Sequence, residues 1–587
     1  MGNLVAEVEP VQRSRRSRPG GARRAVEDAP QKPHSRTLTV CPGLTGARIG
    51  GCPSEGARTT DKNISGKPYS HASPFSRRGT AMEREEESRP FYIPAWYYGG
   101  PDERSARPDN TFVRGEGMFV VREDDTRFED WEGQSLVNNL GLGRADMAKV
   151  LADQVHRLSW LKPSAFSDVR VALTRDLQSI LPHGISIPFY GIGGADSVEA
   201  AIRAARMVTG RKNVLVFRTG FHGDTITTEA VSGWGLPDYG DPRPWVVHVP
   251  SPYDCFQDLG EWDQAYERCL EGIEKALKKR GPRTFACVLV EPVMGVGGVV
   301  PLSTGLSKAL REICDRHGTK LVADEVVTGF GRTGEWFGSS SVGLKPDAIV
   351  LAKGMTGGYA PLSAVVFERS WGEELRQNGF PHGPTFGGHL LGCAAARETI
   401  RILTVERLVE RARTVGAYMK KRLSELGQQH PAVARDVRGM GLLLAIELRP
   451  ARSTTQSTSA EKIGQRAQTV RAHMARRLKE LRREPRGLVR EVLGAGRLLA
   501  RQLRAGGEGR TYGGHPASQR TWAISEGLLN DRIRVWVSGD ASSIMFCPPF
   551  IVTESQVDRL VDRLDFHLRQ ISREDAGPTA TRAPSAV

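Results

Sequence analysis

The sequence lacks the features that would take this chain into a membrane or through a secretory pathway. Its 587 residues contain no run of 18 or more apolar residues, so we expect no transmembrane helix. The N-terminus has no apolar core of a secretory signal, and it carries Ala6 where a myristoylation signal has Ser or Thr. We therefore predict a cytoplasmic protein that binds no membrane, with organelle targeting by the arginine-rich opening as the open alternative.

Cysteines are few, and their spacing excludes a disulfide framework. The eight cysteines stand at positions 41, 52, 255, 269, 287, 314, 393 and 547, with no Cys-x-x-Cys motif among them. Small secreted scaffolds and zinc modules depend on closely spaced cysteines, so neither class is expected. We predict reduced thiols and no metal site.

Apolar residues are also sparse, and the charge is unevenly distributed. Hydrophobic residues make up 39% of the chain, which suggests that part of its length does not fold. Residues 1–81 carry a net charge of +8 and residues 451–520 carry +11, whereas the whole chain carries +15. The rest therefore carries −4, and the basic character belongs to two segments. Neither segment interleaves aromatic residues with its arginines, so we predict no nucleic-acid partner.

Shifts in composition along the chain predict its domain organisation. We expect a disordered basic leader at 1–90, the N-terminal part of a small domain at 91–144, a large domain at 145–400, the rest of the small α+β domain at 401–450 and 521–575, a basic and poorly ordered insertion at 451–520, and a disordered tail at 576–587. A basic amphipathic helix that binds a partner is the alternative for the insertion.

Helical and strand-like patterns alternate through the large domain. Helical periodicity covers 197–209 and 305–317, and short apolar runs typical of buried strands cover 213–217, 287–290, 320–323 and 348–351. This alternation predicts an α/β fold with a mostly parallel sheet flanked by helices.

Lys353 is the most informative single residue. It directly follows the apolar run Ala348–Ala352 and precedes Gly354, so it stands at the end of a buried strand. Loss of hydration there lowers the pKa of a lysine amine, and a neutral amine is a nucleophile. A lysine that merely extends its charged end to solvent is the alternative.

Other strand ends carry groups that suit the same site. Glycines 191, 193 and 194 lead directly into a helix, whose first N–H groups can bind a phosphate. Phe221 and His222 follow the strand at 213–217, where an aromatic ring can stack on a planar ligand. Asp324 ends the strand at 320–323, and a buried carboxylate needs a cationic partner such as a protonated ring nitrogen. The alternatives are a plain loop, a core phenylalanine, a structural histidine and an Asp–Arg pair.

These residues belong to an ordered set of motifs that resembles the class III pyridoxal-phosphate aminotransferases. The resemblance covers about 91–450 and 521–572, and it depends on the order of the whole set. The motifs are Gly194-Ala195-Asp196, Phe221-His222-Gly223, Glu291-Pro292-Val293-Met294-Gly295, Asp324-Glu325-Val326, Gly331-Arg332-Thr333-Gly334, Lys353-Gly354 and Thr385-Phe386-Gly387-Gly388-His389.

The resemblance implies pyridoxal 5'-phosphate as cofactor, fold type I and a homodimer with active sites at the subunit interface. Lys353 resembles the lysine that forms the Schiff base and moves the substrate proton, and Asp324 resembles the carboxylate that keeps the pyridine nitrogen protonated. By the same resemblance, Phe221 and Val326 flank the cofactor ring, Gly194 and Ala195 hold the phosphate, Thr385 reaches the phosphate of the partner subunit, and His222 and Glu291 lie beside the cofactor.

The chain also departs from the family pattern. Ala195 replaces a common Ser or Thr of the phosphate turn, and Val327 stands where many members have Gln. Trp536 and Met545 occupy the two positions where the family often has an arginine for the substrate carboxylate. Arg534 and Arg438 lie nearby in sequence and are the candidates to replace it, with a structural arginine as the alternative for each.

We therefore predict a transaminase of the ω-amino acid:pyruvate or diaminobutyrate-like branch. It would move an amino group from an ω-amino acid or amine donor to a small 2-oxo acid, either pyruvate or 2-oxoglutarate. A mutase or decarboxylase of the same family remains an alternative, because the cofactor residues are common to all three. A catalytically idle relative that binds a partner through its basic insertion is the alternative from another class.

Overall fold

The computed structural model describes residues 111–233, 243–450 and 518–576. The predicted leader, most of the predicted insertion and nearly all of the predicted tail lie outside the described residues. The division into domains therefore stays a prediction.

A seven-stranded mixed sheet forms the centre of the region around Lys353. Six of its strands are parallel, and β12 is antiparallel to both of its neighbours. The order across the sheet is β4 (Ile185–Gly191), β12 (Ser363–Glu368), β11 (Ala348–Leu351), β10 (Lys320–Asp324), β7 (Phe285–Val290), β5 (Asn213–Phe217) and β6 (Val246–Val249).

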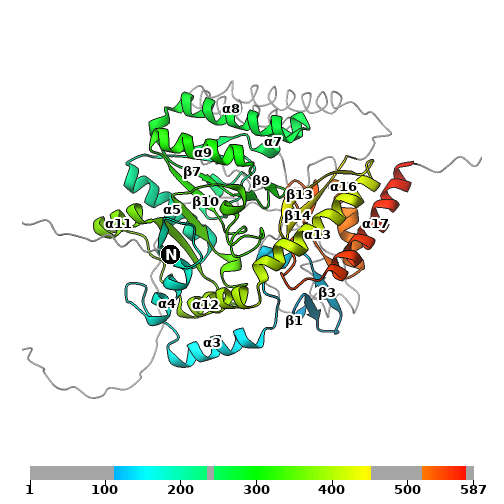
Figure 1. Cartoon of the computed structure of the whole chain (residues 1–587), viewed down its shortest axis with the longest axis horizontal. Helices are drawn as coiled ribbons and strands as arrows, with labels where there is room; N and C mark the ends of the chain where they lie inside the picture. The colour runs from blue at the N-terminus through cyan, green and yellow to red at the C-terminus, as the bar shows by residue number, and fades with distance from the viewer. Residues whose placement is uncertain (1–110, 234–242, 451–517, 577–587) are drawn as a thin grey trace, which may run out of the picture. The chain divides into compact units, whose positions relative to one another are not determined.

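Helices cover both faces of this sheet, as Figure 1 shows for β7 and β10. Val214 and Val216 of β5 pack in one apolar cluster with α5 (Gly194–Thr209) and α11 (Arg369–Asn378). The alternate residues of β5 pack in the other cluster, with α8 (Trp262–Arg280) and α9 (Thr304–His317). Because successive strand residues point to opposite faces, both faces of the sheet are buried.

Two smaller four-stranded sheets contain the later strands, and one of them joins β15 (Ile533–Arg534) to the first three strands. One has the order β13 (Ala434–Met440), β14 (Leu443–Leu448), β17 (Ser543–Phe546) and β16 (Trp536–Val537), and the other has the order β1 (Phe112–Glu116), β2 (Phe119–Arg122), β3 (Arg127–Asp130) and β15. Helices α13 (Leu408–Gln429) and α16 (Ser518–Asn530) pack against them, and α17 (Glu554–Ala576) packs against α13 and α16.

The remaining elements complete the described part. They are α2 (Gly133–Leu136), α3 (Ala145–Arg157), α4 (Asp168–Gln178), α6 (Ile226–Val231), α7 (Pro252–Leu259), η3 (Pro282–Thr284), β8 (Val293–Met294), β9 (Val300–Pro301), α10 (Gly338–Val342), η4 (Lys353–Met355) and α12 (Leu390–Val405).

The predicted α/β architecture is confirmed, and the strands at 213–217 and 348–351 have the expected bounds. One helix differs, because α5 begins at Gly194 and not at the expected Ser197. Its first turn contains glycine and polar residues, which give no apolar periodicity. Among the described residues, no helix is long and apolar enough to span a membrane.

Candidate active site

The sequence-predicted residues meet at one edge of the seven-stranded sheet. Parallel strands place their carboxyl ends at the same edge, and ligands of open α/β sheets bind there. Five of the parallel strands contribute: β4 leads to Gly194, β5 to Phe221 and His222, β7 to Glu291, β10 to Asp324 and β11 to Lys353.

Lys353 begins a tight turn directly after β11. Its φ is +40°, a left-handed backbone conformation that is uncommon for residues other than glycine. Asn139 stabilises this turn, since its Nδ2 donates to the carbonyl oxygen of Gly354 at 3.0 Å. Loss of hydration lowers the pKa of the Lys353 amine, while the negative charges of Asp324 and Glu291 oppose that shift. The site therefore favours a neutral, nucleophilic amine.

Asp324 is buried and pairs with His222. The distance between His222 Nδ1 and Asp324 Oδ2 is 2.8 Å, and the backbone N–H of Val326 donates to Asp324 Oδ1 at 3.1 Å. The alternative that Asp324 pairs with an arginine is wrong in this structure. Arg332 donates instead to backbone carbonyls, among them that of Pro548 at 2.7 Å.

Glu291 bridges two segments of the site. The backbone N–H of Phe221 donates to its Oε1 at 3.0 Å, and that of Gly295 donates to its Oε2 at 2.9 Å. Burial raises the pKa of Glu291 to about 7, a shift that His222 and the two N–H groups moderate and that Asp324 increases. This carboxyl group therefore changes its charge near neutral pH.

We expect Glu291→Gln to change how stability depends on pH. The folded-state pKa of about 7 lies above the ordinary value of 4.5, so Glu291 lowers the stability of the fold as pH rises from about 5 to 8. A shift of this size corresponds to about 2.5 kcal/mol between the two ends of that window. Urea unfolding of both proteins at pH 5 and pH 8 measures it: the variant should gain about that much relative to the native chain, and an equal difference at both pH values contradicts the shift.

The N-terminus of α5 offers free backbone donors. Gly193 caps the helix without any side-chain hydrogen bond, and a Cβ at that position would meet no atom within 4 Å, so the space beside it is open. A Cβ at Gly194 would lie 3.1 Å from Cγ2 of Val326, which packs this turn closely against the end of β10. Free N–H groups at a helix start suit a phosphate, and Ala195 adds no hydroxyl.

Thr385 lies apart from the Lys353 cluster, on an exposed loop between α11 and α12. Two contacts tie this loop to the turn after β4: His382 Nε2 lies 3.0 Å from Asp196 Oδ1, and Gly388 N–H donates to the carbonyl of Gly191 at 3.2 Å. A cavity of about 490 Å³ between the loop and Tyr190 is lined in part by Thr385. Thr385 is thus presented outward from this chain.

The two candidate carboxylate arginines have different surroundings. Arg438 is 5% exposed, and its Nε, Nη1 and Nη2 all donate to other residues of this chain, which leaves no pair of N–H groups for a substrate carboxylate. Arg534 is less buried, and its Nε and Nη2 both donate to one oxygen of Glu132, at 3.2 and 2.9 Å. The structure thus gives Arg438 a structural environment and brings neither arginine into contact with Lys353.

Sequence reasoning missed three residues that support the site. Asn139 holds the turn after Lys353, and Ser232 accepts from the backbone N–H of His222 at 2.8 Å. Cys547 is buried beside Lys353, where burial raises the pKa of its thiol. Only the neighbouring glycines of the segment 138–143 signal that Asn139 lies in a close-packed turn.

The residues present fit pyridoxal phosphate. An amine, a buried carboxylate, an aromatic side chain after β5 and open space before an uncapped helix start are the groups that its aldehyde, ring nitrogen, ring face and phosphate require. Together with the strand order, they define a pyridoxal-phosphate site of fold type I.

Comparison with known proteins gives the same class. Residues 103–462 match the family model of the class III aminotransferases. The chain is 33% identical over 361 residues to the diaminobutyrate–2-oxoglutarate transaminase of Halomonas elongata, covering 58% of this chain and 76% of that protein. It is 32% identical over 410 residues to the putrescine–pyruvate aminotransferase of Pseudomonas aeruginosa, and this match covers 66% of this chain and 86% of that protein.

The crystal structure of a PLP-bound amine transaminase from an uncultivated Pseudomonas species superposes with a TM-score of 0.67. The two sequences are 26% identical, and the match covers 83% of this chain and all of the other. The chain belongs to the class III aminotransferase family, and it is a pyridoxal-phosphate-dependent transaminase that uses an amino donor and a 2-oxo acid.

Proposed function

We propose that the enzyme transfers an amino group from an ω-amino acid or a simple amine to pyruvate or 2-oxoglutarate. The observation that carries the proposal is the apolar wall beside the reactive lysine. Cys547 next to Lys353 belongs to a buried apolar cluster with Leu136, Val293 and Met545, and Trp536 packs against it. Such a wall suits the methylene stem of an ω-amine better than a charged group. Relatives named for diaminobutyrate and putrescine support this choice.

Each catalytic group of the chain has a separate role in the proposed reaction. Bound pyridoxal phosphate supplies an aldehyde that takes up the amino group and a ring that accepts the electron pair of the broken C–H bond. Lys353 Nζ is the nucleophilic amine, and it also takes the proton from the substrate carbon and returns it. Asp324 holds a proton on the ring nitrogen, and His222 keeps the Asp324 carboxylate in place.

The remaining contacts orient and anchor the cofactor. Phe221 and Val326 would flank the ring, and the N–H groups of Gly194 and Ala195 would bind the phosphate. Glu291 fixes the backbone at Phe221. Arg534 is the better candidate for a substrate carboxylate. Among the described residues, Glu132 is the hydrogen-bond partner of its side chain, and a dicarboxylate such as 2-oxoglutarate can replace that partner.

We further propose a cytoplasmic homodimer in which Thr385 serves the neighbouring subunit. Thr385 and Phe386 lie on an exposed loop, and Phe386 is 52% exposed, as expected of residues that a second copy covers. The predicted division into a large domain at 145–400 and a small domain around it belongs to the same proposal.

A donor screen tests the proposed substrates. Purified enzyme is given putrescine, 2,4-diaminobutyrate, taurine or alanine with either pyruvate or 2-oxoglutarate, and the amino acid product is quantified. Turnover with the ω-amines and stoichiometric product from the acceptor support the proposal. Turnover of a donor without any acceptor points to mutase or decarboxylase chemistry and contradicts it.

Heterodimers test the role of Thr385. Thr385→Val should weaken cofactor affinity by about 10-fold or more, because one hydrogen bond to a charged phosphate is worth about 1.5–3 kcal/mol. In a heterodimer of Thr385→Val with Lys353→Ala subunits, the only intact lysine lies in the Thr385→Val subunit. If Thr385 acts across the interface, the intact Thr385 of the Lys353→Ala subunit serves that lysine, and the cofactor affinity there should be native. An affinity as weak as that of the Thr385→Val homodimer contradicts the proposal.

A further inference from the structure

The turn between β8 and β9 is held in a strained conformation. The backbone N–H groups of Gly298 and Val299 both donate to the carbonyl of Gly295, at 3.2 and 3.1 Å. Val299 has a φ of +56°. A β-branched residue avoids that region, so the conformation persists only because neighbouring groups hold it.

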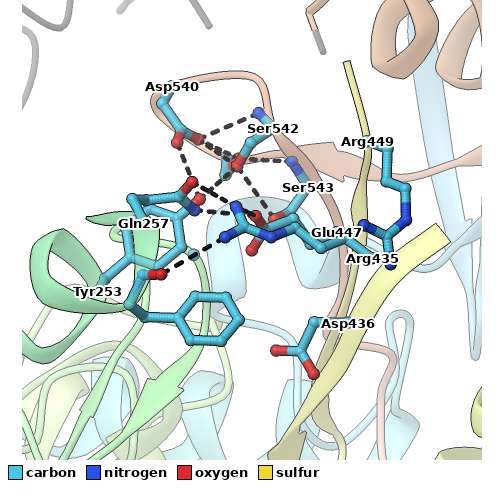
Figure 2. Close-up of polar contacts among 12 residues, drawn as sticks. Tyr253, Gln257, Arg435, Asp436, Glu447, Arg449, Asp540, Ser542 and Ser543 are labelled. Atoms are coloured by element: carbon cyan, nitrogen blue, oxygen red, sulfur yellow. Dashed lines mark hydrogen bonds and ion pairs between the residues drawn. The ribbon is translucent and has the colours of Figure 1, made fainter. Parts of the chain in front are cut away.

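Arg438 is one of those groups. Its Nε donates to the carbonyl of Gly298 at 2.7 Å, and its Nη2 donates to Ser543 Oγ at 3.1 Å. Arg438 also pairs with Glu447, which is fully buried. Figure 2 shows Glu447, Ser543 and Tyr253 in the same network, which joins α7, β14 and β17. The anchor of the turn is therefore rigid and buried.

The same turn reaches the active site at its other end. Gly295 N–H donates to Glu291 Oε2 at 2.9 Å, and Glu291 Oε1 accepts from Phe221 N–H at 3.0 Å. A displacement of the turn removes the first of these bonds and frees the Glu291 carboxylate. The backbone N–H of Phe221 then no longer has an acceptor that is held in place.

We propose that Arg438 is a positioning residue of the transaminase: through the carbonyl of Gly298 it keeps the Gly295 N–H directed at Glu291, and thereby keeps Phe221 in place. The proposal rests on the proposed role of Phe221 beside the cofactor ring. It assigns a function to an arginine that sequence reasoning offered as a substrate ligand. It also explains why a buried charge pair lies next to the site, where an apolar pair would cost less to bury.

Arg435 provides a matched control. Its Nη1 lies 2.9 Å from Glu447 Oε1, so both arginines share one carboxylate, and each stacks on an aromatic ring, Phe256 for Arg435 and Tyr253 for Arg438. Figure 2 shows Arg435 on the Glu447 side of the network. Among its hydrogen bonds in the described structure, none goes to the β8–β9 turn. Replacing either arginine removes an ion pair with Glu447. Replacing Arg438 also removes its pair with Asp436 and the anchor of the turn.

Hydrogen exchange of full-length purified enzyme tests the anchor. Arg438→Met is expected to speed amide exchange in the peptide 293–301 by about 10-fold or more, the effect of losing one charge-assisted hydrogen bond, whereas Arg435→Met leaves that peptide near its native rate. Arg438→Lys keeps the positive charge beside Glu447, so it serves as a second variant if Arg438→Met does not fold. Its exchange rate in the peptide 293–301 should lie between those of the native enzyme and Arg438→Met. Equal rates in the two Met variants overturn the proposal.

The titration of Glu291 separates positioning from plain structural support. The groups that face Glu291 are His222, Asp324, Lys353 and the N–H groups of Phe221 and Gly295. The Gly295 N–H lowers the pKa of Glu291, so the loss of this hydrogen bond in Arg438→Met should raise that pKa above about 7. Infrared spectroscopy follows the carboxyl band of Glu291, which is assigned by its absence in Glu291→Gln. An unchanged titration contradicts positioning. Neither measurement depends on turnover, so a wrong donor class leaves both results interpretable.

Discussion

Lys353→Ala is expected to lose transamination almost completely. The substitution removes the only amine that the described structure places among Asp324, Glu291 and the turn before α5, so both the covalent bond to the cofactor and the proton carrier disappear. Proton transfer by a positioned side chain alone contributes about 10²–10⁴-fold, so we expect kcat/KM to fall by about 10⁴-fold or more. Steady-state kinetics with the preferred donor measure the loss.

Lys345→Ala is the control for this variant. Lys345 is an exposed lysine just before β11, and it contributes nothing to the site. The control should keep native activity and native cofactor content. A Lys353→Ala enzyme that retains more than a few per cent of native kcat/KM contradicts the role of Lys353 as nucleophile and proton carrier.

Asp324→Asn is expected to have the next largest effect. The amide cannot carry the negative charge that keeps the ring nitrogen protonated, so the bound ring loses electron-withdrawing power. A charge-assisted hydrogen bond of this kind is worth about 1.5–3 kcal/mol, which corresponds to a loss of about 10–150-fold in kcat. His222 Nδ1 also loses its ionic partner at 2.8 Å. Single-turnover kinetics should place the loss in proton transfer, with little change in donor binding.

Asp347→Asn is the matched control for Asp324→Asn. Asp347 also lies next to a strand of the sheet, but at the amino end of β11, where it accepts from Leu321 N–H at 2.7 Å and pairs with Arg311 at 3.1 Å. Its replacement should lower the unfolding midpoint and leave kcat near the native value. If both variants lose kcat equally, the loss reflects stability, and the assignment of Asp324 to the ring nitrogen is wrong.

The sequence predicted the strand ends well because two signals coincide there. Apolar runs such as 348–351 mark buried strands, and a polar residue directly after such a run must lie at the sheet edge. Parallel order then brings Asp324 and Lys353 to the same edge without any knowledge of side-chain contacts. The positions of these two residues therefore follow from local pattern and topology.

The supporting contacts could not be predicted in this way. Asn139 reaches Gly354 across 215 positions of sequence, and Arg438 reaches Gly298 across 140. Such pairings depend on how separate elements pack, and a single sequence carries no record of them. Arg438 shows the consequence. Its position in sequence left a substrate arginine and a structural arginine as alternatives, whereas its burial with Glu447 indicates a structural role in holding the β8–β9 turn.

Reduction of the native enzyme with borohydride tests the central claim most directly. The reagent fixes the bond between the cofactor and its lysine, and peptide mass spectrometry then locates the attached pyridoxyl group. The account predicts that the group is found on Lys353, in the peptide that follows the strand 348–351. A pyridoxyl group on any other lysine, or a protein that carries none after incubation with pyridoxal phosphate, would contradict it.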